Sequence, residues 1–172
     1  MIVAFQGKHP RIHETAFVAG DVIIIGDVEI GAGVNIWFHS LLRGDVNSIR
    51  VGAGCNIQDG SILHVGRDRF PLILEEDVVM GHRVTVHGCR IGRGAMVGIG
   101  AIVLDGASIG EEALVGAGAV VPPGAVVPAR SLVLGAPAKP VRELTERDLA
   151  MIHRTRENYR SLMEIYRGIP FP

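Results

Sequence analysis

The chain has few aromatic residues, only two cysteines and no long apolar run. Of its 172 residues 5% are aromatic, although 48% are hydrophobic and 23 are glycine. This composition predicts one domain with an ample core and narrow corners, as a coiled sheet requires. No apolar stretch approaches the length of a membrane span. Two cysteines do not make a disulfide framework.

The chain also lacks an excess of charge of one sign. Its formal charge is -1, with Lys and Arg dispersed along the sequence. This pattern gives no basic footprint for nucleic acid, which we exclude as a partner. The first residues show no basic segment followed by an apolar region and a cleavage site, so we expect no secretory signal, no membrane partner and a cytoplasmic location.

What the sequence does contain is a six-residue period. From Ile73 to Val133 an apolar or β-branched residue recurs at every sixth position: Val79, Thr85, Ile91, Val97, Val103, Ile109, Val115, Val121 and Val127. A small residue stands four positions after most of them: Cys89, Ala95, Ala101, Ala107, Ala113, Ala119, Ala125 and Ser131. We expect both columns to point inward. Cys55 and Cys89 fall in the small column, so we interpret them as core residues.

The same period occurs earlier in the chain. It includes Val18, Ile24, Ile30, Ile36 and Leu42, and then Val51, Ile57 and Leu63. Extra residues at 45–50 and 66–71 shift its phase without ending it, as surface loops on a solenoid do. A six-residue unit suits a short strand and turn, and three units make one triangular coil. The fold class expected is an all-β solenoid, a parallel β-helix.

The solenoid is predicted to span residues 1–140. The segment 135–140 contains two prolines, which cannot donate to a strand ladder, so strand pairing is expected to stop there. In residues 141–172, Thr145 and Asp148 resemble a helix N-cap and its box partner. One helical stripe then precedes Gly168 and consists of Leu149, Ile152, Tyr159, Leu162, Met163 and Tyr166. We expect one α-helix that packs back on the solenoid as part of the same domain.

Three histidines stand near the start of the long series. With three strands per coil, His64 and His87 lie on neighbouring strands, about 4.8 Å apart. His82 lies on the preceding face and nearer a corner, so it is poorly placed to join them within one chain. In a symmetric trimer, His82 of one subunit approaches His64 and His87 of the next.

Three neutral imidazoles with an open fourth position are the ligand set of a catalytic zinc ion, which lowers the pKa of bound water to about 7. The alternative is that these are ordinary surface or core histidines. That is how we interpret the scattered His9, His13, His39 and His153.

Two runs carry a resemblance to a known family. They are residues 56–64, Asn-Ile-Gln-Asp-Gly-Ser-Ile-Leu-His, preceded by Arg43-Gly44-Asp45, and residues 81–89, Gly-His-Arg-Val-Thr-Val-His-Gly-Cys. The chain closely resembles the gamma-class carbonic anhydrases of the hexapeptide-repeat superfamily over nearly its whole length. The resemblance implies a left-handed β-helix, an exception to the right-handed crossover rule. It also implies a homotrimer that hydrates carbon dioxide to bicarbonate with a metal-bound hydroxide.

The resemblance implies roles for particular residues. His64, His82 and His87 would bind zinc, with iron or cobalt as substitutes, and one of them would come from the adjacent subunit. The other site residues implied are Gln58, as hydrogen-bond partner of the hydroxide; Arg43, Asp45 and Asp59, as an interfacial ion network near bicarbonate; Asn56, lining the pocket; and Tyr159, reaching into it. The alternatives are a turn amide for Gln58, ion pairs that only hold the trimer together, and simple helix packing for Tyr159.

The chain also departs from the family archetype. Val46 replaces a glutamate that follows the Arg-Gly-Asp run, and the short insertion 65–70 lacks the acidic loop that exports protons. Both differences count against fast hydration, because proton export can limit turnover. Three alternatives therefore stay open: a metal-dependent acyl-CoA thioesterase, an acetyltransferase-like protein with a histidine base and no zinc, and a non-catalytic trimeric scaffold.

Overall fold

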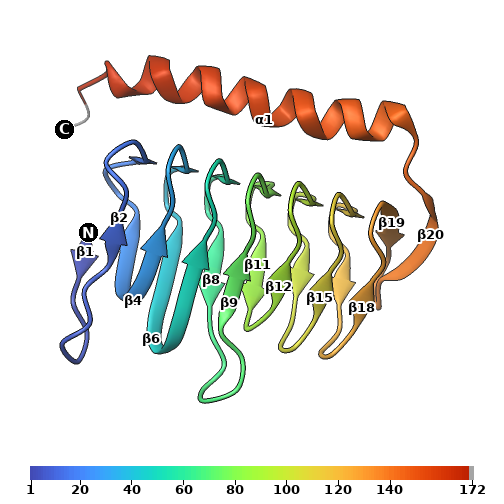
Figure 1. The fold of residues 1–172 in the computed structure, drawn as a ribbon, viewed down its shortest axis with the longest axis horizontal. Coiled ribbons are helices and arrows are strands. Elements are labelled where there is room, and N and C mark those ends of the chain that lie inside the picture. The colour runs from blue at the N-terminus through green and yellow to red at the C-terminus, as the bar shows by residue number, and fades with distance from the viewer. Residues whose placement is uncertain (171–172) are drawn as a thin grey trace.

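The protein is a left-handed parallel β-helix with one long helix beside it (Figure 1). The structure is a computed structural model and describes residues 1–170. Two sheets form the three walls of the coil, because the long strands β4 (Ile23–Ile30) and β6 (Leu41–Val51) bend through one corner and belong to two walls. The prediction of a β-solenoid with a C-terminal helix is confirmed.

We name the walls by what they carry. The helix face consists of β3 (Phe17–Val18), β5 (Asn35–Ile36), β7 (Asn56–Ile57), β10 (Val79–Met80), β13 (Met96–Val97), β16 (Leu114–Val115) and β19 (Ser131–Leu134). The histidine face consists of β1 (Ile2–Val3), the first halves of β4 and β6, β8 (Ile62–His64), β11 (Thr85–His87), β14 (Ile102–Val103) and β17 (Val120–Val121). The third face consists of β2 (Arg11–Ile12), the second halves of β4 and β6, β9 (Leu72–Leu74), β12 (Arg90–Ile91), β15 (Ser108–Ile109) and β18 (Val126–Val127).

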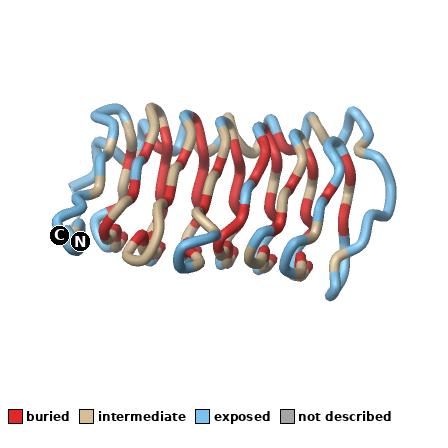
Figure 2. The backbone as a smooth tube through the Cα atoms, turned by 60° about the horizontal axis from the view of Figure 1, so that its bottom comes forward, coloured by how far each residue is buried: buried red, intermediate tan, exposed pale blue. Residues whose placement is uncertain are grey.

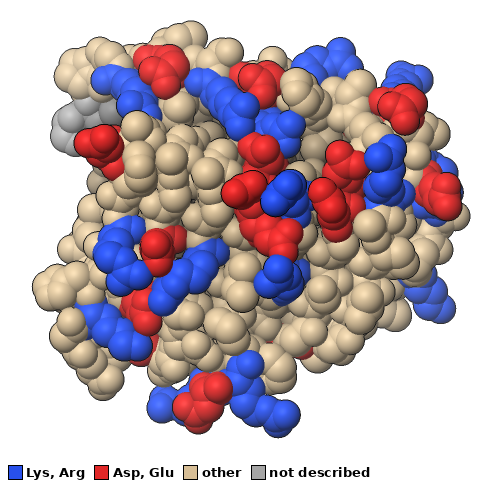
Figure 3. Space-filling model, in the orientation of Figure 1, with Lys and Arg blue, Asp and Glu red and all other residues tan. Residues whose placement is uncertain are grey.

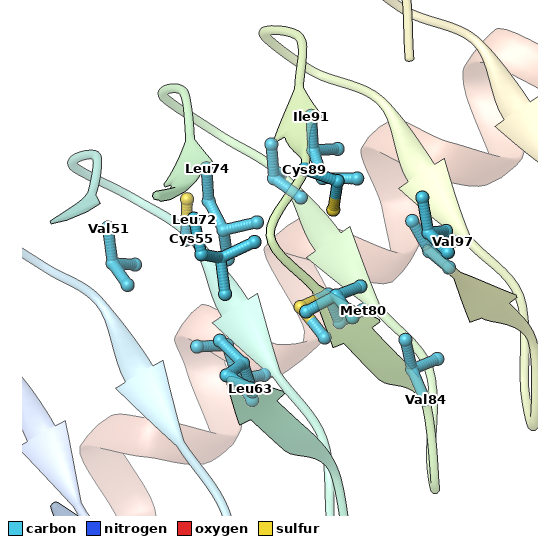
Figure 4. Packing of buried hydrophobic residues seen from close by; sticks show 14 of the residues in the cluster. Val51, Cys55, Leu63, Leu72, Leu74, Met80, Val84, Cys89, Ile91 and Val97 are labelled. Atoms are coloured by element: carbon cyan, nitrogen blue, oxygen red, sulfur yellow. The ribbon is translucent and has the colours of Figure 1, made fainter. Parts of the chain in front are cut away.

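The inward column is as predicted over most of the chain, and the walls are buried while many corners are exposed (Figure 2). The predicted column is displaced by one residue at three positions. Leu74, Met80 and Val86 occupy the column where Ile73, Val79 and Thr85 were expected, and Leu74 and Met80 lie among the core residues (Figure 4).

The reason for the shift is the length of two turns. The loop before Leu72 is one residue longer than the expected phase allows. The inward column therefore restarts at Leu74, opposite Val51, and not at Ile73. The step from Val86 to Ile91 is then five positions and restores the phase. Val18 keeps the register of the inward column, opposite Ile36, but it is only partly buried.

The end of the solenoid differs from the prediction. After a turn at residues 135–138, β20 (Lys139–Glu143) pairs antiparallel with β19 and includes Pro140. Strand pairing therefore does not stop at this segment. Proline is tolerated because β20 is an edge strand and all its residues are exposed.

Helix α1 (Glu146–Arg167) begins at the predicted cap. Thr145 accepts a hydrogen bond from the Asp148 amide, and the Asp148 carboxylate accepts one from the Thr145 amide. The stripe packs against the helix face through the buried Ile152 and Met163. Leu162, which was placed on the stripe, is 39% exposed and faces outward.

No helix within residues 1–170 is long and apolar enough to cross a membrane. In the view of Figure 3, basic and acidic side chains alternate rather than gather by sign. Ion pairs such as Arg11–Glu29 at 2.6 Å and Lys8–Asp27 at 3.0 Å account for this pattern.

Candidate metal centre

The histidine face carries an outward row of three side chains in register. His64 pairs with His87 on one side and with Arg43 on the other, on the neighbouring strands β11 and β6. The register places both histidines one position after an inward residue, Leu63 or Val86. The predicted adjacency of His64 and His87 therefore agrees with the structure, although the inward residue beside His87 is Val86 and not Thr85.

Each of the two histidines has one nitrogen facing the other ring and one facing a carboxylate. His64 Nδ1 lies 3.0 Å from His87 Nε2. His64 Nε2 lies 3.0 Å from Asp45 Oδ1, and His87 Nδ1 lies 2.6 Å from Asp105 Oδ1. Arg43 donates a short hydrogen bond to Asp45. The row is thus a connected chain of charged and polar groups.

These groups fit a metal ion. Two ligand nitrogens of a tetrahedral zinc lie about 3.3 Å apart, given Zn–N bonds of about 2.0–2.1 Å, which is close to the separation of the facing nitrogens. Ligand histidines usually donate their other N–H to a carboxylate, which fixes ring orientation, and Asp45 and Asp105 accept in this way. The two histidines could therefore serve as two ligands of one ion without rearrangement of their strands.

Asp45 is held in its charged form. Burial would raise the pKa of its carboxyl, but the hydrogen bonds from His64 and Arg43 outweigh burial and lower the pKa below the usual value. A charged Asp45 orients both Arg43 and His64. The contact between Arg43 and Asp45 supports an ion network at this wall. Asp59, the third residue of the predicted network, lies elsewhere.

His82 and Asp59 lie at the corner between the helix face and the histidine face. His82 Nδ1 contacts Asp59 Oδ2 at 2.9 Å, and His82 Nε2 lies 3.3 Å from the hydroxyl of Tyr159 on α1. The corner borders a hollow of about 610 Å³, lined by His39, Asp59, Gly60, His82, Arg83 and Ile99. Burial raises the pKa of Tyr159, and the charge of Asp59 adds to this effect.

Gln58 and Asn56 lie on the helix face beside this corner and are almost fully buried. Gln58 Nε2 donates to Asn56 Oδ1 at 2.9 Å. Both side chains therefore lie on the wall that leads to His82 and not on the wall of His64. The predicted site residues form two groups in one chain, and among residues 1–170 no three His, Cys, Asp or Glu side chains are arranged to hold a metal ion.

Asp105 is a site residue that the sequence analysis missed. It follows β14 and reaches His87 because Gly88, at φ +49, has no side chain in the way. A Cβ at Gly88 would collide with Asp105 Oδ1 and with Phe70. The signal that could have found Asp105 is its distance of 18 residues from His87, one regular coil in this solenoid.

Within residues 1–170, the remaining histidines make no hydrogen bond or ion pair with these two groups, although His39 lines the hollow beside His82. His39 pairs with Asp21 at 2.6 Å, and His13 contacts Thr15 at 2.9 Å. His9 and His153 are exposed. Both cysteines are buried and free, and burial raises the pKa of each thiol to about 12.

Comparisons with known proteins agree with this geometry. The family profile of the bacterial transferase hexapeptide (six repeats) matches residues 88–123. A carbonic anhydrase from Geobacillus kaustophilus is 46% identical, over 98% of this chain and 92% of that protein. Gamma carbonic anhydrase 2 of Arabidopsis thaliana, a mitochondrial protein, is 38% identical, and the match covers 92% of this chain but only 59% of that longer protein.

A solved structure from Bacillus cereus, provisionally described as an acetyltransferase, superposes with a TM-score of 0.96. It is 42% identical, and the match covers 99% of this chain and 98% of that one. Fold and sequence thus define a hexapeptide-repeat protein with a left-handed β-helix. Within that superfamily the chain belongs to the gamma-class carbonic anhydrase-like proteins.

Proposed function

We propose that the protein is a trimeric metalloenzyme that reversibly hydrates carbon dioxide at sites shared between adjacent subunits. The observation that carries the proposal is the facing pair His64 and His87, 3.0 Å apart and each backed by a carboxylate, while the third expected ligand, His82, lies at another corner. A pair of ligands on one wall and a single ligand at a corner are complementary halves of one site. A neighbouring copy supplies the missing half.

A column of apolar side chains supports this assembly. Leu41, Ile62, Ile102 and Val120 are in register on the outer side of the histidine face, with Thr85 among them. Ile62 is 44% exposed, although it lies two positions from His64. An apolar stripe beside a row of ligands is suited to burial against a second copy of the chain.

A zinc ion held by three imidazoles would supply a hydroxide nucleophile at neutral pH. The chain's own groups would act around it. Asp45 and Asp105 would hold the rings of His64 and His87. Asp59 would hold His82 through Nδ1, so that Nε2, which lies 3.3 Å from the Tyr159 hydroxyl, would be the nitrogen available to the metal. Gln58 offers a hydrogen bond, and Arg43, which is half exposed, is available to an anionic product.

The first experiment combines metal analysis with stopped-flow carbon dioxide hydration on the same anaerobically purified protein, supplied with zinc or with iron. We expect bound metal and hydration, and the loss of both in His82→Ala. Fully active His82→Ala would refute the site. Bound metal without hydration would favour the thioesterase or scaffold alternative, and an active transferase without metal would favour the reaction suggested by the Bacillus cereus relative.

Mixed trimers test whether a site is shared. His64→Ala and His82→Ala should each lose their metal, but subunits of the two kinds together rebuild intact sites. With random mixing about a quarter of the interfaces would pair an intact His64 with an intact His82, because each of two neighbours is of the needed kind half the time. If the ligands all came from one chain, mixing would restore nothing. His153→Ala, an exposed histidine on α1, is the control.

A further inference from the structure

A chain of buried amides runs beneath α1 and ends at Gln58. Asn35 and Asn56 are in register on β5 and β7, and they are 1% and 0% exposed. Asn56 Nδ2 donates to Asn35 Oδ1 at 2.6 Å, and Gln58 Nε2 donates to Asn56 Oδ1 at 2.9 Å. Each amide therefore depends on its neighbour for the choice of which end donates. The chain has one of two possible directions.

The direction is decided at the far end, by Trp37. Its indole Nε1 donates to Asn35 Oδ1 at 2.8 Å. An indole N–H is a donor only, so it requires the oxygen of Asn35 at that position. Once this oxygen is placed there, Asn56 must donate its N–H to it and present its own oxygen to Gln58.

An unsatisfied atom shows that the direction is imposed. Asn35 Nδ2 is buried and has no hydrogen-bond partner among the described residues. If the Asn35 amide were rotated by half a turn, this nitrogen would face Asn56. It could then donate to Asn56 Oδ1, provided that the Asn56 amide rotated as well. An unpaired buried donor costs about 1–3 kcal/mol, so the orientation persists because turning would leave the Trp37 N–H without an acceptor.

We infer that Trp37 and Asn35 are positioning residues that make Gln58 present its carbonyl oxygen, not its amide nitrogen, beyond the chain. Gln58 Oε1 accepts no hydrogen bond from the described residues, and the next residue, Asp59, contacts His82. The oxygen can accept from a protic ligand such as water but cannot donate to an anion. Its role towards such a ligand rests on the proposed function, whereas the direction of the amide chain does not.

Trp37 also packs against Tyr159, with ring centroids 5.3 Å apart, and Tyr159 contacts His82. One indole thus supports both groups beside His82. The two contributions are separable, because Phe can keep the ring packing of Trp37 without its N–H. Phe17, whose ring centroid lies 5.2 Å from that of Trp37, offers the matched control for packing alone.

The test is neutron diffraction on the perdeuterated, metal-free protein, which locates the deuterons of each amide. In the wild type we expect the Gln58 deuterons to point at Asn56. In Trp37→Phe we expect the chain to reverse, so that Asn56 donates to Gln58 and Asn35 Nδ2 gains a partner. In Phe17→Leu the wild-type direction should persist. A reversed chain in the wild type, or an unreversed one in Trp37→Phe, would overturn the inference.

If Trp37→Phe does not fold, Asn35→Leu removes the acceptor to which Asn56 donates. The Gln58 amide is expected to reverse in that variant too. A kinetic measurement then tests separately whether the direction of the amide chain matters for hydration. With metal content and KM unchanged, kcat for hydration should fall roughly 3- to 10-fold in Trp37→Phe, the loss expected for one misplaced hydrogen bond. Reversal of the amides without any fall in kcat would support the positioning of Gln58 and contradict its proposed part in hydration.

Discussion

Asp105 matters because it fixes one ring of the candidate centre. Its Oδ1 lies 2.6 Å from His87 Nδ1, the nitrogen that does not face His64. Asp105→Asn keeps the size of the side chain but weakens the acceptor. We expect zinc affinity to fall about 10- to 100-fold, as for other carboxylates that orient ligand histidines. Competition with a chelator of known affinity measures this fall.

The control for Asp105→Asn is Asp21→Asn. Asp21 also contacts a histidine, His39, at 2.6 Å, but this pair lies apart from the His64–His87 row. Zinc affinity should be unchanged in this variant. Equal losses in both variants would mean that the effect is general electrostatics and not the orientation of His87.

The two cysteines should be inert while the protein is folded. Burial raises the pKa of Cys55 and Cys89 from 9.0 to about 12, so both thiols keep their protons at pH 8. Ellman's reagent should label neither in the native protein and both after unfolding in guanidinium. Because the folded thiols hold protons more tightly, stability falls as the pH rises from about 9 to about 12. Native labelling as fast as that of the unfolded chain would contradict this.

At the scale of elements, one carboxylate of the solenoid, that of Asp77, pairs with two arginines of α1. Asp77 pairs with Arg160 at 2.7 Å and with the mostly buried Arg156 at 3.8 Å. Asp77→Asn removes the charge, and asparagine tolerates the positive φ of 61° at this corner. We expect the free energy of unfolding to fall by about 1–3 kcal/mol, because Arg156 keeps its charge without a carboxylate partner. Hydrogen exchange should also accelerate in α1.

Glu112→Gln is the matched control, since Glu112 also sits at a corner with positive φ and pairs with an arginine, Arg130. Both side chains of this ion pair are about half exposed, and exposed pairs contribute little to stability. Denaturant unfolding should not distinguish this variant from the wild type. If Asp77→Asn were equally neutral, the attachment of α1 would not depend on this carboxylate.

The elements also show what a sequence pattern can predict. A period of six sets three strands per coil, so the pairing of His64 with His87 follows from counting. The one-residue error at Ile73, Val79 and Thr85 arose because the length of the loop before Leu72 has no periodic signal. Side-chain hydrogen bonds, whether between residues two positions apart, as for Trp37 with Asn35, or between coils, as for Asp105 with His87, depend on side-chain direction and were not predicted.

At the scale of the molecule, each of the three walls has a different outer surface. The helix face is covered by α1, and the third face carries charged residues such as Arg90 and Glu75, which pair with each other. The histidine face carries the apolar column beside the ligands. This asymmetry is what a subunit needs if only one wall meets its neighbours, and under the proposed function it would make assembly and metal binding parts of one event.

Ile62→Asp tests that coupling. A carboxylate at this exposed position is tolerated in a lone chain but is costly if the wall is buried against a copy. We expect the variant to stay folded, to run as a monomer in light scattering, and to bind no zinc, although every histidine is present. Val126→Asp, at a position 76% exposed on the third face, should remain trimeric and bind metal. A monomeric Ile62→Asp that still binds zinc with wild-type affinity would show that one chain completes the site by itself.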